Sequence, residues 1–272
     1  MSLETRSTPG PWRPAPLLYT SAGVHCGAAA IVLTQIELWP WALAAVAANH
    51  ALLAAAGLTP RSHLLGPNWT RLPRTADDRR IALTFDDGPD PEITPRVLEI
   101  LARAAVPATF FCIGERVAAA PALTREILAA GHAIENHSQR HLHHFSLLGP
   151  RGLRAEIECA QQTIAATAGV APLFFRAPAG LRSPLLDPLL QRLGLRLASW
   201  TRRGFDTVNT RPQRVLGTLA RRLGPGDMLL LHDGHAARTA RGSAVVLEVL
   251  PELLAAVDRA GLQPVTLRAA LT

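Results

Sequence analysis

The sequence predicts an α/β fold, a distorted (β/α) barrel of about seven parallel strands, preceded by a hydrophobic helical hairpin. From residue 79 onward, short β-rich runs alternate with longer amphipathic runs, which is typical of βα units in a parallel sheet. Before residue 59, two apolar stretches are separated by a short turn. The alternation predicts the barrel, and the paired apolar stretches predict the hairpin.

Changes in composition divide the chain into a polar leader (1–15), a transmembrane or membrane-associated helical hairpin (16–58), a linker containing proline and glycine (59–78) and an α/β domain (79–272). The expected strands of that domain are residues 81–85, 107–113, 132–135, 173–177, 195–200, 227–231 and 263–267. The expected helices lie near residues 93–104, 116–130, 151–168, 184–193, 211–223 and 243–260.

The hairpin is predicted from length and apolar character. Leu17–Ile36 is about as long as the roughly 20 residues that cross a bilayer. Two tryptophans follow at the turn, a residue type that favours membrane interfaces. The second run, Ala42–Leu58, is weaker because Asn49 and His50 lie at its middle. A secretory signal peptide is shorter and in one part. Soluble helices packed on the domain are the other alternative.

Charge predicts the orientation of the hairpin. The turn holds only Glu37, whereas arginines flank both outer ends, namely Arg6, Arg13, Arg61, Arg71, Arg74, Arg79 and Arg80. By the positive-inside rule, the α/β domain is expected to face the cytoplasm.

Composition narrows the class of protein. Hydrophobic residues make up 48% and charged residues 18%, which excludes general disorder. The net charge is +7 and the chain contains no lysine. The arginines are scattered, without recognition-helix or zinc-finger spacing, so we expect no nucleic-acid partner. Three cysteines without CxxC spacing predict no disulfide framework, and Cys26 and Cys112, in apolar runs, are expected to be buried.

The first candidate functional motif ends the first expected strand. Asp86 and Asp87 follow a buried apolar run and precede Gly88 and Pro89, which turn the chain. Side chains alternate along a strand, so the two carboxylates are expected to point in different directions, one to a metal and the other to a reacting water. A turn with two solvated carboxylates is the alternative.

A histidine pair follows the third expected strand. His137 and His141 are four residues apart, so on a helical turn they would share a face and reach one ion. With Asp87 they form a set of two histidines and one carboxylate, which leaves positions open for water and substrate. We interpret His143 and His144 as solvated loop residues.

Further polar residues follow the later strands. Arg176 precedes Pro178, Ala179 and Gly180, a loop suited to presenting a backbone N–H. Asp206 follows the fifth expected strand and His232 ends the sixth. Taken alone, Arg176 would be a surface cation and Asp206 a loop acid.

In order and approximate spacing, four motifs resemble the polysaccharide deacetylase family (NodB-homology domain, carbohydrate esterase family 4). They are Thr84-Phe85-Asp86-Asp87-Gly88-Pro89, His137-Ser138-Gln139-Arg140-His141, Arg176-Ala177-Pro178-Ala179-Gly180 and Leu230-Leu231-His232. The resemblance covers about residues 79–268 and implies that residues 79–272 are a catalytic domain.

The resemblance implies a role for each matching residue. Asp86 would be the base and His232 the acid, while Asp87, His137 and His141 would bind the metal, with zinc the default and cobalt or nickel alternatives. Arg176 would pair with Asp86, and Asp206 would hold His232. The substrate contacts would come from Pro178, Ala179, Gly180 and Leu230, with Leu230 lining the pocket for the acetyl methyl group.

Departures from the family pattern affect the sugar site. Ala179 stands where an aromatic residue is usual, and Arg203 and Thr207 stand where an acid and a tryptophan are common. Ala179 keeps its backbone N–H but removes one wall of the site.

The predicted function is removal of N-acetyl, or related N-acyl, groups from amino sugars of a glycan or lipid-linked saccharide, with a hydrolase attached to a bacterial inner membrane. The alternatives are a catalytically silent, membrane-anchored glycan-binding module and an O-deacetylase or deformylase of a lipid-linked sugar.

Overall fold

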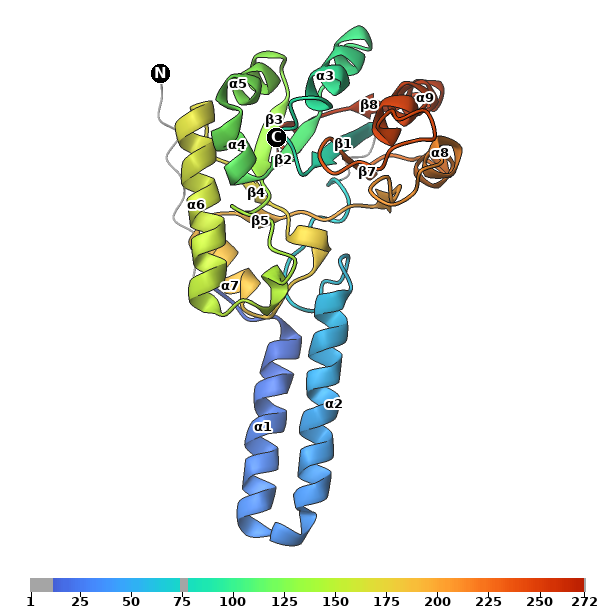
Figure 1. Cartoon of the computed structure of the whole chain (residues 1–272). Helices are drawn as coiled ribbons and strands as arrows, with labels where there is room; N and C mark the ends of the chain where they lie inside the picture. The colour runs from blue at the N-terminus through green and yellow to red at the C-terminus, as the bar shows by residue number, and fades with distance from the viewer. Residues whose placement is uncertain (1–11, 74–77, 272) are drawn as a thin grey trace.

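The computed structural model describes residues 12–73 and 78–271, so most of the predicted leader lies outside the described residues. Figure 1 shows a half-barrel of parallel strands with two long helices projecting from it. The strands are β1 (Arg80–Asp86), β2 (Thr109–Cys112), β3 (Ala133–Asn136), β4 (Phe174–Phe175), β5 (Arg196–Leu197), β6 (Arg202–Arg203), β7 (Met228–His232) and β8 (Gln263–Pro264). The predicted fold class is confirmed.

Strand order places β1 at the centre. The order across the sheet is β5–β4–β3–β2–β1–β7–β6, and β8 pairs with the beginning of β1. Asp86 lies level with Phe111 on one side and with His232 on the other. The carboxyl end of β1 therefore meets the ends of both neighbouring strands.

Residues of β1 alternate between two layers. Ile81, Leu83 and Phe85 are buried in the outer core with helices that cover the sheet. Ala82 belongs to a second apolar cluster on the inner face, with Phe111 and other residues. By the same alternation, the side chain of Asp86 points into the half-barrel.

The helices of the domain are α3 (Thr94–Arg103), α4 (Gly114–Ala119), α5 (Pro121–Ala129), α6 (Pro150–Ala168), α7 (Leu186–Arg192), α8 (Pro212–Ala220) and α9 (Val245–Arg259). Two details differ from the sequence-based expectation. The helix expected at 116–130 is divided before Pro121, which starts the second helix. The run expected as one strand at 195–200 becomes β5, and the unpredicted β6 follows it after a bend.

The segment after the hairpin packs onto the open side of the half-barrel. The backbone of Trp69 pairs with the chain beside Ala198, and the N–H of Leu72 donates to the carbonyl of Gly226, 2.8 Å away. Leu65 and Leu72 are fully buried. This part of the chain thus connects the region after β5 with the turn before β7.

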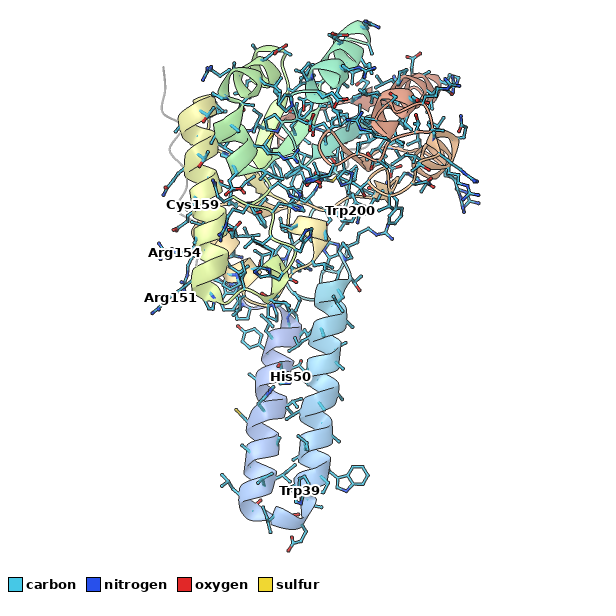
Figure 2. All side chains as sticks on the ribbon, viewed as in Figure 1. Trp39, His50, Arg151, Arg154, Cys159 and Trp200 are labelled. Atoms are coloured by element: carbon cyan, nitrogen blue, oxygen red, sulfur yellow. The ribbon has the colours of Figure 1, made fainter. Side chains whose placement is uncertain are left out.

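The N-terminal hairpin consists of α1 (Pro16–Thr34), a short turn of 3₁₀ helix (Ile36–Leu38) and α2 (Trp39–Leu58). Figure 1 shows the two helices side by side and directed away from the domain, and Figure 2 shows Trp39 at the far end. Each helix is long and apolar enough to cross a bilayer, with a mean hydropathy of 1.5. The two helices therefore suggest a membrane anchor or a signal sequence. Cys26 is exposed on α1, so the expectation of a buried thiol is wrong there, while Cys112 is buried. An isolated hairpin of apolar helices has too little packed surface to bury such a side chain.

Two polar contacts join the helices of the hairpin. The Nδ2 of Asn49 donates to the Oγ of Ser21 at 2.9 Å, and the Nε2 atoms of His25 and His50 lie 3.2 Å apart. Between apolar helices such bonds stabilise association.

The end of α2 is fixed to the domain. The N–H of Arg182 donates to the carbonyl of Gly57 at 3.1 Å. A Cβ at Gly57 would lie 2.3 Å from the carbonyl oxygen of Arg182, so only glycine permits this approach.

Candidate active site

The predicted site residues gather at the carboxyl ends of β1, β3, β4 and β7. A hollow of about 770 Å³ lies there. Its wall includes Asp86, Asp87, His137, His141, Ala179, Gly180, Leu230 and His232. Arg176 and Asp206 are fully buried beside it, and Pro178 is buried rather than in the wall. Segments that are far apart in the sequence therefore meet in one site.

Asp86 is held by a buried arginine. The Nη1 of Arg176 lies 2.5 Å from the Oδ1 of Asp86 and also donates to the Oγ1 of Thr84. Its other donors reach the carbonyls of Ala198 and Ser199. Burial lowers the pKa of the Arg176 guanidinium, although the carboxylate of Asp86 opposes this effect. The pairing fixes the position of one oxygen of Asp86 and leaves the other facing the hollow.

Asp87 points toward the histidines instead. Its Oδ1 lies 3.2 Å from the Nε2 of His137 and 3.2 Å from the Nε2 of His141. Asp87 has a φ of 71°, a left-handed conformation that turns its side chain away from the direction of Asp86. The two neighbouring carboxylates thus point in different directions, but the left-handed backbone after the end of β1, rather than alternation along the strand, sets the direction of Asp87.

The histidine pair does not lie on a helix, so that part of the prediction is wrong. Residues 137–141 form a loop in which Ser138 and His141 have positive φ values of 65° and 53°. The Oγ of Ser138 accepts a hydrogen bond from the N–H of His141 at 3.0 Å. This turn brings the centroids of the two imidazole rings to within 4.9 Å of each other. The loop thus places both imidazoles beside Asp87 without a helical turn.

The donor atoms of Asp87, His137 and His141 fit a divalent cation. All three ligand atoms lie within 4.8 Å of one another. The Oδ1 of Asp87 is buried and has no hydrogen-bond partner in the described part of the chain. The Nδ1 of His137 lies 2.8 Å from the carbonyl of Arg176 and must donate to it, so a neutral ring would present its Nε2 lone pair to the carboxylate. A cation there, either a metal ion or a proton on Nε2, removes the repulsion between these lone pairs.

The pKa shifts of Asp87 and His137 also favour a positive charge at this cluster. Burial lowers the pKa of His137, but the carboxylates of Asp86 and Asp87 outweigh it and raise that pKa. Burial would raise the pKa of Asp87, but the three neighbouring imidazoles hold it well below its ordinary value. Burial and the charge of His137 lower the pKa of His141 to about 4, so that ring is neutral and able to bind a metal at pH 7.

His232 lies on the other side of Asp86 in the sheet and is oriented by an acid. Its Nδ1 is 2.8 Å from the Oδ1 of Asp206, and its backbone N–H donates to the Oδ2 of the same carboxylate at 2.8 Å. Burial lowers the pKa of His232, but the charge and hydrogen bond of Asp206 outweigh burial and raise it. The ring therefore presents its Nε2 side to the hollow and holds a proton more readily than a free imidazole.

The loop after β4 forms one wall of the hollow. Ala179 has a φ of 54° and is exposed in the wall, while Gly180 has a φ of 74°. A Cβ on Gly180 would lie 2.5 Å from the ring of Trp200 and 2.7 Å from Pro60, so glycine is required there. Leu230 contributes a buried apolar side chain. His143 and His144 are exposed, as expected.

Sequence reasoning missed two residues of this site. The Nδ1 of His235 lies 3.3 Å from the Oδ2 of Asp87, and its Nε2 lies 2.9 Å from Arg116. The only signal in the sequence is the position of His235, three residues after His232. Asp233 is also buried beneath the site, where burial and the charges of Asp87 and Asp86 raise its pKa to about 7.

A half-barrel whose strand ends carry one aspartate with two histidines, beside an arginine-paired aspartate and an aspartate-paired histidine, defines a class of hydrolases that use a bound metal. Comparison with known proteins gives the family. Residues 74–198 match the model of the polysaccharide deacetylase family. The chain is 35% identical over 158 residues to a chitooligosaccharide deacetylase of a Bradyrhizobium species, covering 58% of this chain and 72% of the relative.

Two further comparisons agree. The chain is 34% identical over 179 residues to a peptidoglycan-N-acetylglucosamine deacetylase of Bacillus cereus, covering 65% of this chain and 83% of the relative. The structure of a family 4 carbohydrate esterase from Streptomyces lividans in complex with acetate superposes with a TM-score of 0.62 at 30% identity, over 70% of this chain and 93% of that one. The protein belongs to the polysaccharide deacetylase family.

Metal binding at this cluster can be measured without turnover. Zn²⁺ at about 100 times its dissociation constant is expected to stabilise the wild-type protein by about 2.7 kcal/mol, raising Tm by several degrees. His141→Gln should abolish most of that rise because one ligand is lost. His144→Gln, an exposed histidine of the same loop, should keep it. An equal Zn²⁺-dependent rise in Tm for His141→Gln and wild type would contradict the assignment.

Proposed function

We propose that the protein is a metal-dependent deacetylase that hydrolyses the N-acetyl amide of N-acetylglucosamine units in a glycan. One observation carries this proposal: a carboxylate held by Arg176 and an imidazole held by Asp206 face the same hollow as the Asp87, His137 and His141 cluster. The assigned substrates of the two relatives, chitooligosaccharide and peptidoglycan N-acetylglucosamine, support the choice of sugar.

Each group has a role that its contacts support. Asp86 accepts the proton of the water that attacks the acetyl carbonyl, and Arg176 keeps this carboxylate oriented for the transfer. His232 donates a proton to the nitrogen as the carbon–nitrogen bond breaks, so that acetate and a free amine leave. A divalent cation held by Asp87, His137 and His141, which we propose is Zn²⁺ with Co²⁺ or Ni²⁺ as substitutes, supplies a Lewis acid when bound.

Leu230 and the loop after β4 would position the acetyl group. Leu230 offers an apolar surface for the methyl group, and the N–H of Ala179 is proposed to donate to the carbonyl oxygen as negative charge develops. Gly180 and Pro178 hold the loop in the shape that this requires. Ala179 leaves the sugar side of the hollow open, which suits a substrate that is bound by groups elsewhere along the wall.

The alternatives make different demands on the site. A silent glycan-binding module has no use for an oriented base and acid around a metal, and the contacts of Asp86 and His232 favour turnover. An O-deacetylase needs less help from His232, because an alkoxide leaves more readily than an amine anion. N-formyl and O-acetyl sugars therefore belong among the tested substrates.

Acetate release from N-acetylglucosamine oligomers tests the proposal directly. Asp86→Asn is expected to reduce kcat by about 10²- to 10⁴-fold, because general base catalysis is lost. Chelation should abolish activity and added Zn²⁺ should restore it. Asp258→Asn, an exposed acid on α9, is the matched control. Turnover that survives both chelation and Asp86→Asn would rule out this mechanism, and Zn²⁺ binding without turnover on any glycan would favour the silent module.

The pH profile tests the pairing of Asp206 with His232. Asp206 raises the pKa of His232, and the acid form of His232 is lost as pH rises through that pKa. Asp206→Asn should therefore lower this pKa and move the alkaline limb of kcat to lower pH. Metal content should stay at the wild-type level, since Asp206 is not a proposed ligand. An unchanged alkaline limb would show that His232 is not the group that limits activity there.

We also propose that α1 and α2 anchor the protein in a bacterial inner membrane, with the catalytic domain on the cytoplasmic side. The helices project away from the domain with most of their apolar side chains exposed, including Trp41 at 76% and Leu33 at 85%. The turn carries one acid, and the arginines lie at the outer ends. Both features support a spanning hairpin whose ends are cytoplasmic.

The native thiols report this orientation. Cys159 is exposed on α6, at the side of the domain shown in Figure 2, while Cys112 is buried and Cys26 would lie within the bilayer. In spheroplasts, a membrane-impermeant maleimide is expected to label the protein only after permeabilisation. Cys159→Ser should remove that label. Labelling of Cys159 in intact spheroplasts would reverse the proposed orientation.

A further inference from the structure

A second hollow lies directly beside the candidate active site and is lined by arginines. It has a volume of about 590 Å³ and shares Trp200 and Arg203 with the active-site hollow. In the described part of the chain, its wall contains five arginines and no acidic side chain, the arginines being Arg61, Arg202, Arg203, Arg221 and Arg222. Such a surface concentrates positive charge where a bound sugar would extend from the active site.

Among the described residues, one of these arginines pairs with an acid and the other four do not. The Nε of Arg202 pairs with Asp227 at 2.8 Å, and its remaining nitrogens donate to the carbonyls of Arg221 and Arg222. Within residues 12–73 and 78–271, the side chains of the other four form no ion pair with an acid. Their charges are therefore available to a ligand.

Arg203 is the residue placed between the two hollows. Among the residues that the structure describes, its buried Nε has no hydrogen-bond partner, and its guanidinium lies 5.5 Å from the ring centroid of Trp200 and 5.1 Å from that of Phe205. A buried N–H without an acceptor lowers the stability of the fold. Because the guanidinium lies near two aromatic rings, its N–H groups are the part left to bind a ligand. An anion at the junction of the hollows would satisfy that donor.

The arginine-lined hollow continues to the base of the hairpin. It shares Arg61 and Thr201 with a third hollow of about 680 Å³, whose wall includes Leu52 and Ala56 of α2. Local contacts fix this junction. The Nη1 of Arg61 donates to the carbonyl of Thr201 at 3.0 Å, and the Oγ of Ser199 donates to the carbonyl of Pro60 at 2.6 Å. Figure 2 shows Trp200 in the domain just beyond the end of α2.

We infer that these arginines bind the phosphate of an amino sugar that is linked through phosphate to a lipid chain. This inference rests on the proposed deacetylase function. The N-acetyl sugar occupies the active-site hollow, the phosphate meets Arg203, Arg221 and Arg222, and the chain leaves along α2. Guanidinium groups match phosphate oxygens in pairs, and four arginines without an acidic partner among the described residues suit a phosphate better than a single carboxylate. With α2 in the bilayer, the third hollow lies where the chain enters the membrane.

Binding is tested in full-length protein carrying Asp86→Asn, reconstituted in phosphatidylcholine nanodiscs, so that no turnover is needed. The probes are N-acetylglucosamine linked through phosphate to a prenyl chain, an alkyl N-acetylglucosaminide of equal chain length without phosphate, and N-acetylglucosamine 1-phosphate without a chain. The prenyl phosphate probe is expected to bind at least about tenfold more tightly than either of the others. Raising the salt concentration should reduce its advantage over the uncharged glycoside.

Substitutions locate the binding. The double variant Arg221→Gln, Arg222→Gln should reduce the advantage of the phosphate probe over the uncharged glycoside by about tenfold or more. Arg203→Gln alone should reduce it as well. Arg125→Gln, an exposed arginine on α5, is the matched control and should leave it unchanged. Circular dichroism and Tm of each variant separate lost binding from lost folding.

The outcomes separate this inference from the proposed function. Equal affinity for the charged and uncharged lipid probes, or an advantage that survives the arginine substitutions, would overturn it. Equal affinity for the chain-free sugar phosphate would overturn the lipid part and identify a soluble sugar phosphate as ligand. Arginine-dependent binding in a protein that releases no acetate from any substrate would support the phosphate site while contradicting the deacetylase function.

Discussion

A buried guanidinium is the constraint on which the rest of the site depends. Arg176 lies inside the half-barrel, where an apolar layer would otherwise fill the space, with its guanidinium carbon 4.0 Å from the ring centroid of Phe111. It can remain charged there only because Asp86 and three other oxygens accept its hydrogen bonds. Removing one partner of such a buried pair costs about 3–5 kcal/mol. The same contacts tie β1 to the chain after β5, so fold stability and the position of Asp86 have one cause.

This pairing gives the two neighbouring carboxylates different chemistry. Asp86 is neutralised by a fixed cation on the inner face of β1, whereas Asp87 leaves the strand in a left-handed conformation and meets only imidazoles. A mobile divalent cation is therefore favoured beside Asp87, and a proton can be accepted at Asp86. His232 ends the adjacent strand at the same level as Asp86, with its own acid behind it. The short distances between these groups follow from parallel strands ending at one edge.

The sequence predicted those features of the fold and the site that depend on residues close together along the chain. Alternation along β1 indicated its two faces, and the four motifs indicated Asp86, Asp87, His137, His141, Arg176 and His232. Asp206 was indicated by its place after the fifth expected strand, and the fold brings all seven residues together. The predictions that were wrong concern geometry that does not follow from a repeating pattern of residues along the chain. His137 and His141 meet through positive φ values rather than a helical turn. Cys26 is exposed because, within residues 12–73 and 78–271, no third element covers α1. His235 and the arginine-lined hollow depend on contacts between distant segments, which one sequence without its fold does not specify.

Contacts at the junction between the hairpin and the domain link the end of α2 to the candidate active site. Pro60 packs against Gly180 of the loop that lines the candidate active site, and Arg61 donates to Thr201 of the neighbouring hollow, so the segment that follows α2 and the substrate loop hold one another in position. A hairpin used only as a tether would need no such contacts, and a flexible linker would suffice. If the hairpin spans a membrane as proposed, these contacts fix the site at a set height above the bilayer and confine its substrates to those that reach that height. For a lipid-linked sugar, attachment of enzyme and substrate to one surface raises their effective concentration without any further contact. An open sugar wall at Ala179 is then compatible with selective binding, because the proposed phosphate site and membrane attachment would supply what an aromatic wall would otherwise provide.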